Sequence, residues 1–173
     1  MAHDNNVMNE ITVIPSPHGP LRLRPEREDD RAFRVQLFRD SRPELSMLPL
    51  PPEACEQIIA HQFNAQTVGY RTQFPRARFD IIELDGKAIG RIVVDRPGKM
   101  VHIVDQAITP AFRNIGLGTA IMRWLMQEAT DLGLPVRLMV FSGNDPSRRL
   151  YERLGFVPIA ESATHVEMEW RSQ

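Results

Sequence analysis

The chain has 173 residues, of which 42% are hydrophobic and 25% are charged, and its formal net charge is −1 at pH 7. This length and composition suit one globular domain with a real core, and the balanced charge excludes nucleic acid or an anionic membrane as an expected main partner. The single cysteine, Cys55, excludes an internal disulfide and a cysteine-rich zinc site, and it fits a reducing cytoplasm. We expect neither a secretion signal nor a membrane span, since no apolar run approaches about 18 residues.

The first part of the chain predicts a loose start, one strand and two helices. Prolines crowd the opening residues, which show little periodicity, so we expect a flexible N-terminal arm before a single folded domain. In the first helix Phe33 and Leu37 lie four residues apart, which is the spacing of one helical face. The predicted boundaries are an arm over 1–20, one domain over 21–173, a strand over 21–25, a helix over 26–40, a proline-broken loop over 42–52 and a helix over 53–70.

The remainder of the chain predicts strands with two helices inserted between them. Asp85 and Gly86, between two alternating runs, are a strong hairpin signal. Apolar residues at helical spacing follow Gly116 and end at Gly133. The run over 136–142 is almost wholly apolar, which predicts a strand covered on both faces. The predicted boundaries are strands over 78–84, 87–95 and 100–109, a helix over 116–132, a strand over 136–142, a short helix from Asn144 or Asp145 to Gly155, and a hairpin of 156–162 with 165–170.

This order of elements predicts a mixed α/β fold in one layered domain. Within it, "RNIGLG" (113–118) places Gly116 and Gly118 between the strand over 100–109 and the helix over 116–132. Glycine lets the backbone lie close to a ligand, and a helix N-terminus offers unpaired N–H groups and a positive dipole end. The stretch therefore favours a phosphate-binding turn. The alternative is that the glycines only make a tight strand-to-helix connection.

Other motifs for phosphate binding and for hydrolysis are absent. A dinucleotide fingerprint needs a third glycine where Ile121 stands, and it follows the first strand of its domain rather than a later one. The sequence has no Gly-Lys-Ser/Thr nucleotide loop, no His-Glu-x-x-His zinc motif and no Gly-x-Ser-x-Gly nucleophile elbow. Dinucleotide-binding, nucleotide-hydrolysing, zinc-peptidase and serine-hydrolase functions therefore have no support.

Two motifs in this sequence resemble the GCN5-related N-acetyltransferase (GNAT) superfamily. The acyl-CoA signature of that family is Gln/Arg-x-x-Gly-x-Gly/Ala, and Arg113, Gly116 and Gly118 fill it. Pro110 precedes the signature by three residues, as is common in the family. A second family feature, "NDPSRRLYERLGF" (144–156), follows at the expected distance. Two motifs in the right order and on the expected elements make the resemblance specific.

The resemblance covers about residues 21–170 and implies a fold. In this family one mixed, mostly antiparallel sheet is flanked by helices. Its two central parallel strands, here 100–109 and 136–142, part at one end. The resemblance further implies that acetyl-CoA is held between these strands as the acyl-donor cosubstrate, and no metal is expected.

The resemblance also implies roles for individual residues. The backbone of 114–119 would bind the pyrophosphate of CoA, and that of 106–108 would pair with the pantetheine arm like an added strand. The N–H near Ile108 would stabilise the thioester oxyanion. Asn144 would contact the arm from the other side, and Tyr151, a phenol with an ordinary pKa of about 10, would protonate the departing thiolate. The candidate CoA-binding residues are Gln106, Ala107, Ile108, Arg113, Asn114, Ile115, Gly116, Leu117, Gly118, Thr119, Asn144 and Tyr151.

Three of these residues also have purely structural interpretations. Arg113 can be a solvated surface charge, because the backbone does most of the binding in such a turn. Asn144 can be only the N-cap of the following helix, or can serve both purposes. Tyr151 can be a buried structural tyrosine. The sequence leaves these alternatives open.

The general base is the least determined part of the site. An amine must lose a proton before it attacks a thioester, and many family members use a glutamate on one of the central strands. In one branch this glutamate lies five residues before the motif asparagine, where this chain has Met139. The remaining candidates are Asp105, His102 and Glu83. We favour Asp105, which directly precedes the stretch assigned to pantetheine; its alternative is a solvent-exposed charge at a strand edge.

These observations predict an acyl-CoA-dependent N-acyltransferase that moves acetyl from acetyl-CoA to a primary amine by direct attack in a ternary complex. The alternative is a non-catalytic acyl-CoA-binding sensor or regulatory module, which the complete tyrosine–asparagine motif disfavours. Expected partners are acetyl-CoA and an unidentified amine acceptor, with no nucleic acid and no membrane, for a cytoplasmic monomer or homodimer. Acceptor specificity is expected to lie in 41–57 and 161–167, whose residues do not identify the acceptor.

Overall fold

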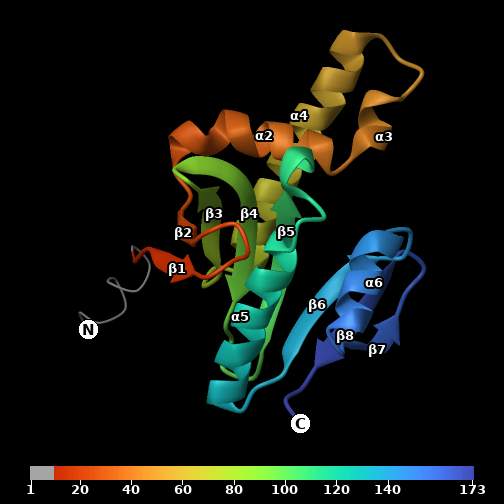
Figure 1. Cartoon of the computed structure of the whole chain (residues 1–173). Coiled ribbons are helices and arrows are strands. Elements are labelled where there is room, and N and C mark those ends of the chain that lie inside the picture. The colour runs from red at the N-terminus through yellow and green to blue at the C-terminus, as the bar shows by residue number, and fades with distance from the viewer. Residues whose placement is uncertain (1–9) are drawn as a thin grey trace.

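Eight strands form one sheet in the order β1-β2-β3-β4-β5-β6-β8-β7 (Figure 1). Neighbouring strands run antiparallel except β5 and β6 in the centre, which run parallel. This arrangement confirms the mixed, mostly antiparallel sheet expected from the sequence. The structure is a computed structural model that describes residues 10–173. Its strands are β1 (Thr12–Ile14), β2 (Leu21–Pro25), β3 (Arg78–Leu84), β4 (Lys87–Asp95), β5 (Val101–Ile108), β6 (Val136–Phe141), β7 (Val157–Glu161) and β8 (His165–Trp170).

Helices cover the two faces of this sheet, with α5 and α6 in front of it and part of α4 behind it in Figure 1. The apolar face of α5, including Leu117, Ile121 and Leu125, packs into the main hydrophobic core against the strands. No helix within residues 10–173 has both the length and the apolar character needed to cross a bilayer. The helices are α2 (Arg31–Asp40), α3 (Pro43–Ser46), α4 (Pro52–Gln73), α5 (Leu117–Leu132) and α6 (Asp145–Arg153), with short 3-10 helices η1 (Glu28–Asp30) and η2 (Pro110–Phe112).

The first helical region differs from its predicted boundaries. The helix expected over 26–40 begins later, because the backbone N–H of Glu26 donates to the carbonyl of Phe79 at 3.0 Å and so extends the pairing of β2 with β3. The proline-broken loop expected over 42–52 contains the short helix α3. Pro43 occupies the first position of α3, where the missing N–H of proline costs nothing.

The N-terminal segment is more ordered than the sequence predicts. A flexible arm was expected over 1–20, but β1 lies within it and pairs antiparallel with β2. Ile14 of β1 is only 1% exposed and belongs to the main core. In the following turn a ring nitrogen of His18 lies 3.1 Å from the carbonyl oxygen of Ile115. The expectation is therefore wrong for these residues, since the prolines end β1 instead of preventing it; residues 1–9 lie outside the described residues.

Strand β6 is covered on one face only, which contradicts the expectation from its apolar sequence. Val136, Leu138 and Val140 are buried in the main core, whereas Met139 is 57% and Phe141 56% exposed. The reason lies in the placement of α4, whose side chains pack with residues of β3, β4 and β5 in a separate hydrophobic cluster. The second face of β6 lies beyond that cluster and remains in contact with solvent.

We predict that Ile14→Ala destabilises the protein by about 2–5 kcal/mol, because it leaves a cavity in the main core. Val13→Ala is the matched control: Val13 is exposed on the same strand, so its truncation should change the free energy of unfolding by less than about 0.5 kcal/mol. Chemical denaturation of the two variants and the wild type measures both values. Equal stability of all three proteins would show that β1 contributes nothing to the core.

Candidate active site

The two central strands part halfway along their length. The parallel pairing of β5 with β6 ends at Ile103 and Leu138, although β5 continues to Ile108 and β6 to Phe141. At the same point the register between β4 and β5 shifts, which leaves Val104 as one extra residue on β5. Such a β-bulge bends its strand and increases its twist. The bulge therefore accounts for the gap between β5 and β6, which the family resemblance implied.

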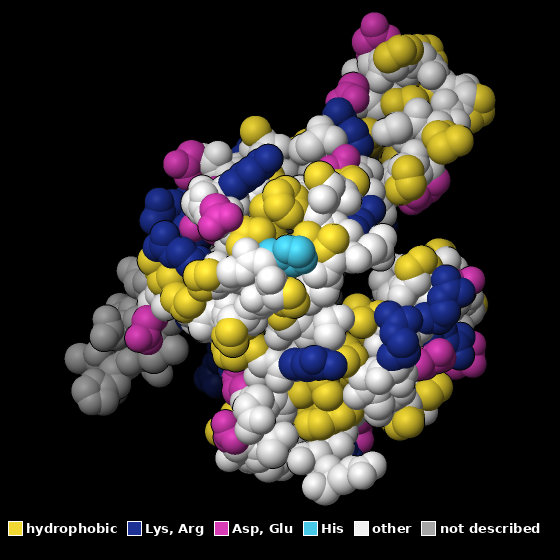
Figure 2. Space-filling model, in the orientation of Figure 1, with side chains coloured by type: hydrophobic (Ala, Val, Ile, Leu, Met, Phe, Trp, Pro, Cys, Tyr) yellow, Lys and Arg dark blue, Asp and Glu magenta, His cyan; other side chains and the backbone are white. Residues whose placement is uncertain are grey.

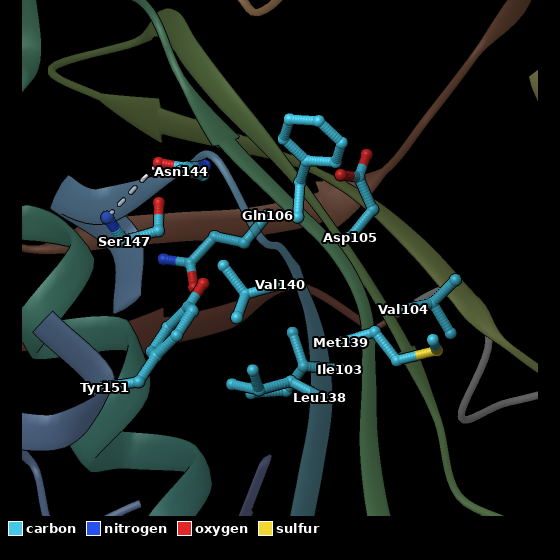
Figure 3. A pocket seen from close by; sticks show the side chains of 11 residues that line it. Ile103, Val104, Asp105, Gln106, Leu138, Met139, Val140, Asn144, Ser147 and Tyr151 are labelled. Atoms are coloured by element: carbon cyan, nitrogen blue, oxygen red, sulfur yellow. Dashed lines mark hydrogen bonds between the residues drawn. The ribbon is translucent and has the colours of Figure 1, made fainter. Parts of the chain in front are cut away.

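A cavity of about 130 Å³ lies in this gap (Figure 3). Figure 3 shows Tyr151 and Gln106 on one side of the strands and Asp105 on the other. This follows from strand geometry, because consecutive side chains point to opposite faces of a sheet. The cavity is thus reached from both faces of the sheet. Its lining residues are Ile103, Val104, Asp105, Gln106, Leu138, Met139, Val140, Phe141, Asn144, Ser147 and Tyr151.

The glycine-rich turn lies directly before α5. Gly116 is the N-cap residue of α5 and has a φ of 88°, a left-handed conformation that favours glycine. The N–H groups in the first turn of a helix have no intrahelical partners, and no side chain caps them in α5. A Cβ on Gly118 would lie 3.6 Å from Nε2 of Gln106 and 3.7 Å from Cδ1 of Ile108. The free N–H groups therefore stand next to the end of β5 and suit a phosphate.

Arg113 positions this turn through backbone carbonyls. Its Nε donates to the carbonyl of Ile108 at 2.7 Å, and its Nη2 donates to the carbonyl of Asp40 at 3.3 Å. The N–H of Thr109 donates to the carbonyl of Ile89 on β4. Along a strand, the N–H groups of successive residues point in turn to the strand on one side and to the strand on the other. The N–H of Ile108 therefore faces the gap. Arg113 is exposed, but its side chain is held against the turn by these two hydrogen bonds; its contact with CoA stays a prediction.

Gln106 brings a side-chain acceptor that the sequence did not indicate. Its Oε1 is buried and has no hydrogen-bond partner, and the amide lies beside Tyr151 at the gap in Figure 3. A buried acceptor without a partner costs about 1–3 kcal/mol. A ligand that supplies N–H donors would remove this cost, and the pantetheine arm of CoA carries amide N–H groups. The residues of the gap therefore fit acyl-CoA.

Asn144 caps α6, as its structural interpretation predicts. Its Oδ1 accepts a hydrogen bond of 3.3 Å from the backbone N–H of Ser147 (Figure 3). This bond uses only the oxygen of the amide, so the amide nitrogen of Asn144 keeps its donors for a ligand. Because the residue lines the cavity, capping and ligand contact are compatible.

Tyr151 projects from α6 towards the gap and is half-buried (Figure 3). Its ring packs near Phe156, with ring centres 5.8 Å apart. Within residues 10–173 the hydroxyl makes no hydrogen bond. Burial raises the pKa of Tyr151 to about 12, and the negative charge of Asp105 adds to the shift. The phenol is therefore protonated at neutral pH and has a free proton to donate.

Asp105 faces the opposite side of the gap, and its side chain is 26% exposed. Burial raises the pKa of this carboxyl above its usual range, while the nearby charges of Arg91 and Arg42 oppose the rise. The distance from Nη1 of Arg91 to Oδ2 of Asp105 is 3.5 Å. A carboxylate with a raised pKa is a stronger base than an ordinary one.

The other two base candidates do not line the cavity. The ring of His102 packs edge-on against Phe74, with centres 5.2 Å apart, and burial lowers its pKa. Glu83 lies on β3 and accepts a 2.6 Å hydrogen bond from Arg24. Asp105 is therefore the carboxylate that the fold brings to the gap.

A buried ion-pair network behind Asp105 was not predicted. The side chain of Glu26 is buried and accepts hydrogen bonds from Arg34 at 3.3 Å, from Arg71 at 2.5 Å and from Arg91 at 2.9 Å. Arg91 then reaches Asp105. One signal in the sequence was available, because Arg91 is a lone charge inside an apolar strand, and such charges are rarely buried unless they are paired.

A glycine turn at a helix N-terminus, beside a sheet that opens at its one parallel pair, is the architecture of a transferase that uses acyl-CoA. The profile of the Acetyltransferase (GNAT) family matches residues 36–156. This match spans more than half of the chain, and the chain belongs to that family. It is an acyl-CoA-dependent N-acetyltransferase with acetyl-CoA as cosubstrate.

Two curated proteins and two solved structures illustrate the similarity. An uncharacterized N-acetyltransferase from Methanocaldococcus jannaschii is 26% identical over 115 residues, which cover 60% of this chain and 70% of that protein. An N-alpha-acetyltransferase from Sulfurisphaera tokodaii is 29% identical over 94 residues, 46% of this chain and 56% of that protein. The PaiA N-acetyltransferase from Thermoplasma acidophilum, in complex with coenzyme A, has a TM-score of 0.67 at 15% identity, covering 88% of this chain and 99% of that one. RimJ from Mycobacterium smegmatis, with CoA-disulfide, has a TM-score of 0.62 at 19% identity, covering 94% and 87%. These structures confirm the expected fold.

We predict that Gly118→Val abolishes acetyl-CoA binding without unfolding the protein. The Cβ itself meets only ordinary contacts, but the branched methyl groups would occupy the space where the backbone approaches the phosphates. Acetyl-CoA at 100 times its dissociation constant should stabilise the wild type by about 2.7 kcal/mol, and thermal unfolding measures the loss of this shift.

Gly69→Val is the control, because a Cβ on this helical residue has nothing within 4 Å. It should keep the full shift with acetyl-CoA. A Gly118→Val protein that is still stabilised by acetyl-CoA would contradict the assignment of the phosphate-binding turn.

Proposed function

We propose that this enzyme transfers the acetyl group directly from acetyl-CoA to a primary amine, with both substrates bound at once. The observation that carries the proposal is that Tyr151 and Asp105 line one cavity from opposite faces of the sheet (Figure 3). Donor and acceptor can therefore approach the gap from different sides. No covalent acyl carrier is needed when the amine reaches the thioester carbon itself.

The donor is held mainly by backbone groups in this proposal. The unpaired edge of β5 over 106–108 pairs with the pantetheine arm, and the N–H groups of 114–119 bind the pyrophosphate. The orphaned acceptor of Gln106 supports the first contact, and the uncapped start of α5 supports the second. The N–H of Ile108 is the donor proposed for the thioester oxygen, whose negative charge grows as the amine attacks.

Tyr151 acts on the leaving sulfur. Its pKa of about 12 keeps the hydroxyl protonated at neutral pH. A thiol has an ordinary pKa of about 8.5, so its thiolate is a weaker base than this tyrosinate. We therefore assign Tyr151 to hydrogen-bond donation: its hydroxyl keeps the proton and donates to the sulfur as the carbon–sulfur bond breaks. CoA leaves as the thiolate, and the proton of the amine passes to Asp105.

Asp105 acts on the amine. An amine is mostly protonated at neutral pH and must lose a proton before it attacks. The carboxylate of Asp105 first attracts the ammonium and then takes the proton, directly or through water. Its raised pKa supports the second role, and its position on the face opposite Tyr151 supports the first (Figure 3).

We place this reaction in the cytoplasm. Cys55 is the only cysteine of the chain and is a buried free thiol, which is compatible with a reducing compartment. The proposed reaction uses acetyl-CoA and an amine, and it requires neither a metal nor a nucleic acid or membrane. The cavity is lined by residues of one chain, so a monomer or a homodimer can carry it out.

We predict that Tyr151→Phe lowers kcat by on the order of 10²-fold or more. The change removes only the hydroxyl, so the ring still packs near Phe156 and acetyl-CoA should still raise the melting temperature. Release of free thiol, measured with and without an acceptor amine, gives the rate. Equal turnover in variant and wild type would return Tyr151 to a structural role.

We predict that Asp105→Asn slows the chemical step and removes the acidic limb of the rate–pH profile. In the wild type this limb should lie above the pKa of an ordinary carboxylate, because burial raises the pKa of Asp105. If Asp105 only attracts the amine, the same change raises KM and leaves kcat near normal. An unchanged profile with unchanged KM would contradict both roles.

Stability is the control for the Asp105→Asn variant. A carboxyl whose pKa is raised on folding disfavours the folded state when it is ionised, so its contribution to stability is lost as pH rises from the unfolded to the folded pKa. Asp105→Asn should therefore unfold at the same or a higher temperature than the wild type at neutral pH. Lost activity together with a lower melting temperature would indicate damage to the fold.

A further inference from the structure

The face of the gap that holds Asp105 combines one carboxylate with exposed apolar side chains. Met139 lies on the side of Asp105 in Figure 3, and Phe141, two residues along β6, shares its face. Both side chains line the cavity and are more than half exposed, at 57% and 56%. The ring of Phe141 packs edge-on against His165, with centres 5.7 Å apart.

These apolar side chains stand where the amine must arrive under the proposed direct transfer. The opposite face of β6 is buried in the main core, so Met139 and Phe141 contribute little to holding the fold together. Two large apolar side chains next to a polar catalytic cavity mark a surface for an apolar ligand group. An acceptor that brought only polar atoms would leave the exposed parts of Met139 and Phe141 facing water or polar groups.

The charges around the cavity limit the acceptor further. Among the lining residues, Asp105 is the one with an ionisable acidic side chain. Its neighbours Arg91 and Arg42 are both cations that act on it, and Arg91 shares its other partner, Glu26, with Arg34. On the same face, Glu167 stands opposite Met139 on β8, and its carboxylate lies 3.8 Å from Arg137. Asp105 can therefore balance one ammonium, whereas a second ammonium beside it would meet Arg91 and Arg42.

The arm formed by α3 and α4 projects from the rest of the protein (Figure 1). Figure 2 shows a notch between the projecting arm of α3 and α4 and the lobe that carries α6, with apolar side chains on the arm. Met47 and Leu50, in and beside the connection from α3 to α4, are exposed apolar residues of this arm. This arm therefore offers further exposed apolar surface beside the notch.

We infer that the acceptor carries a single amine next to an apolar group, and that polyamines are poor acceptors. This inference rests on the proposed function, because it uses the face of Asp105 as the acceptor side. Two sources share this chemistry: a free alkyl or aryl-alkyl amine, and the N-terminal residue of a peptide with an apolar side chain.

The test measures kcat/KM of the full chain with acetyl-CoA by free-thiol release. The small acceptors are 2-phenylethylamine, ethanolamine and spermidine, and the peptide acceptors are Met-Ala-amide and Ser-Ala-amide. We expect each apolar acceptor to exceed its polar counterpart by about tenfold or more, as one well-placed apolar group allows, and spermidine to be the weakest of the amines. The better of the two apolar acceptors identifies the source.

Variants assign the preference to residues. Met139→Ser and Phe141→Ser should lower kcat/KM for the apolar acceptors by about tenfold more than for the polar ones. Val157→Ser is the matched control, because Val157 is exposed on β7 and does not line the cavity. Arg42→Gln should raise kcat/KM for spermidine several-fold, because it removes one repelling charge.

The outcomes separate this inference from the proposed function. Turnover of all amines with equal kcat/KM, or a preference for spermidine, would overturn the inference and leave acetyl transfer to amines intact. An apolar preference that survives Met139→Ser and Phe141→Ser would also overturn it. If none of the amines supports thiol release, although acetyl-CoA still stabilises the protein, the result would contradict the proposed function instead.

Discussion

Backbone N–H and C=O groups inside a sheet need partners. After Ile103, β5 still pairs with β4 but no longer with β6. The extra residue at Val104 bends β5 away from β6 and leaves an open edge in the middle of the protein. Arg113 satisfies one carbonyl of that edge, and the buried acceptor of Gln106 stays without a partner. In the proposed binding mode, the amide groups of the pantetheine arm would supply the hydrogen-bond partners that this edge lacks.

On the other face of the gap, the fold holds the carboxylate of Asp105 partly out of water. A carboxylate near the sheet is costly unless it is paired, and Asp105 is stabilised by Arg91, which is itself anchored by Glu26. Removal of Glu26 would leave the buried charges of Arg34 and Arg91 without this partner. The network therefore ties the strand that carries Arg91 to the helices that carry Arg34 and Arg71, and it holds Arg91 beside the partly exposed carboxylate of Asp105. The same ion pairs therefore hold these elements together and set the charge around Asp105.

Much of the donor site could be predicted from the sequence because its signals are local. The glycines at 116 and 118 directly precede a helix, and their backbone geometry follows from that position. Asn144 caps α6 from one residue before it, and Tyr151 follows at a fixed helical distance. The strands and hairpins also agree with their alternating patterns and turn residues, because these depend on neighbouring residues.

Tertiary structure decided which faces are covered and which charges meet. The apolar sequence of β6 predicts burial on both faces, but α4 packs on β3, β4 and β5, so Met139 and Phe141 remain exposed. The N-terminal prolines predict a loose arm, but Ile14 enters the core because β1 finds the free edge of β2. The sequence by itself determined the fold family and the glycine turn before α5, and it predicts that this turn binds phosphate and that Tyr151 acts in the site. It could not determine the Glu26–Arg91–Asp105 network or the acceptor face, because strand coverage and ion pairing depend on residues far apart in the chain.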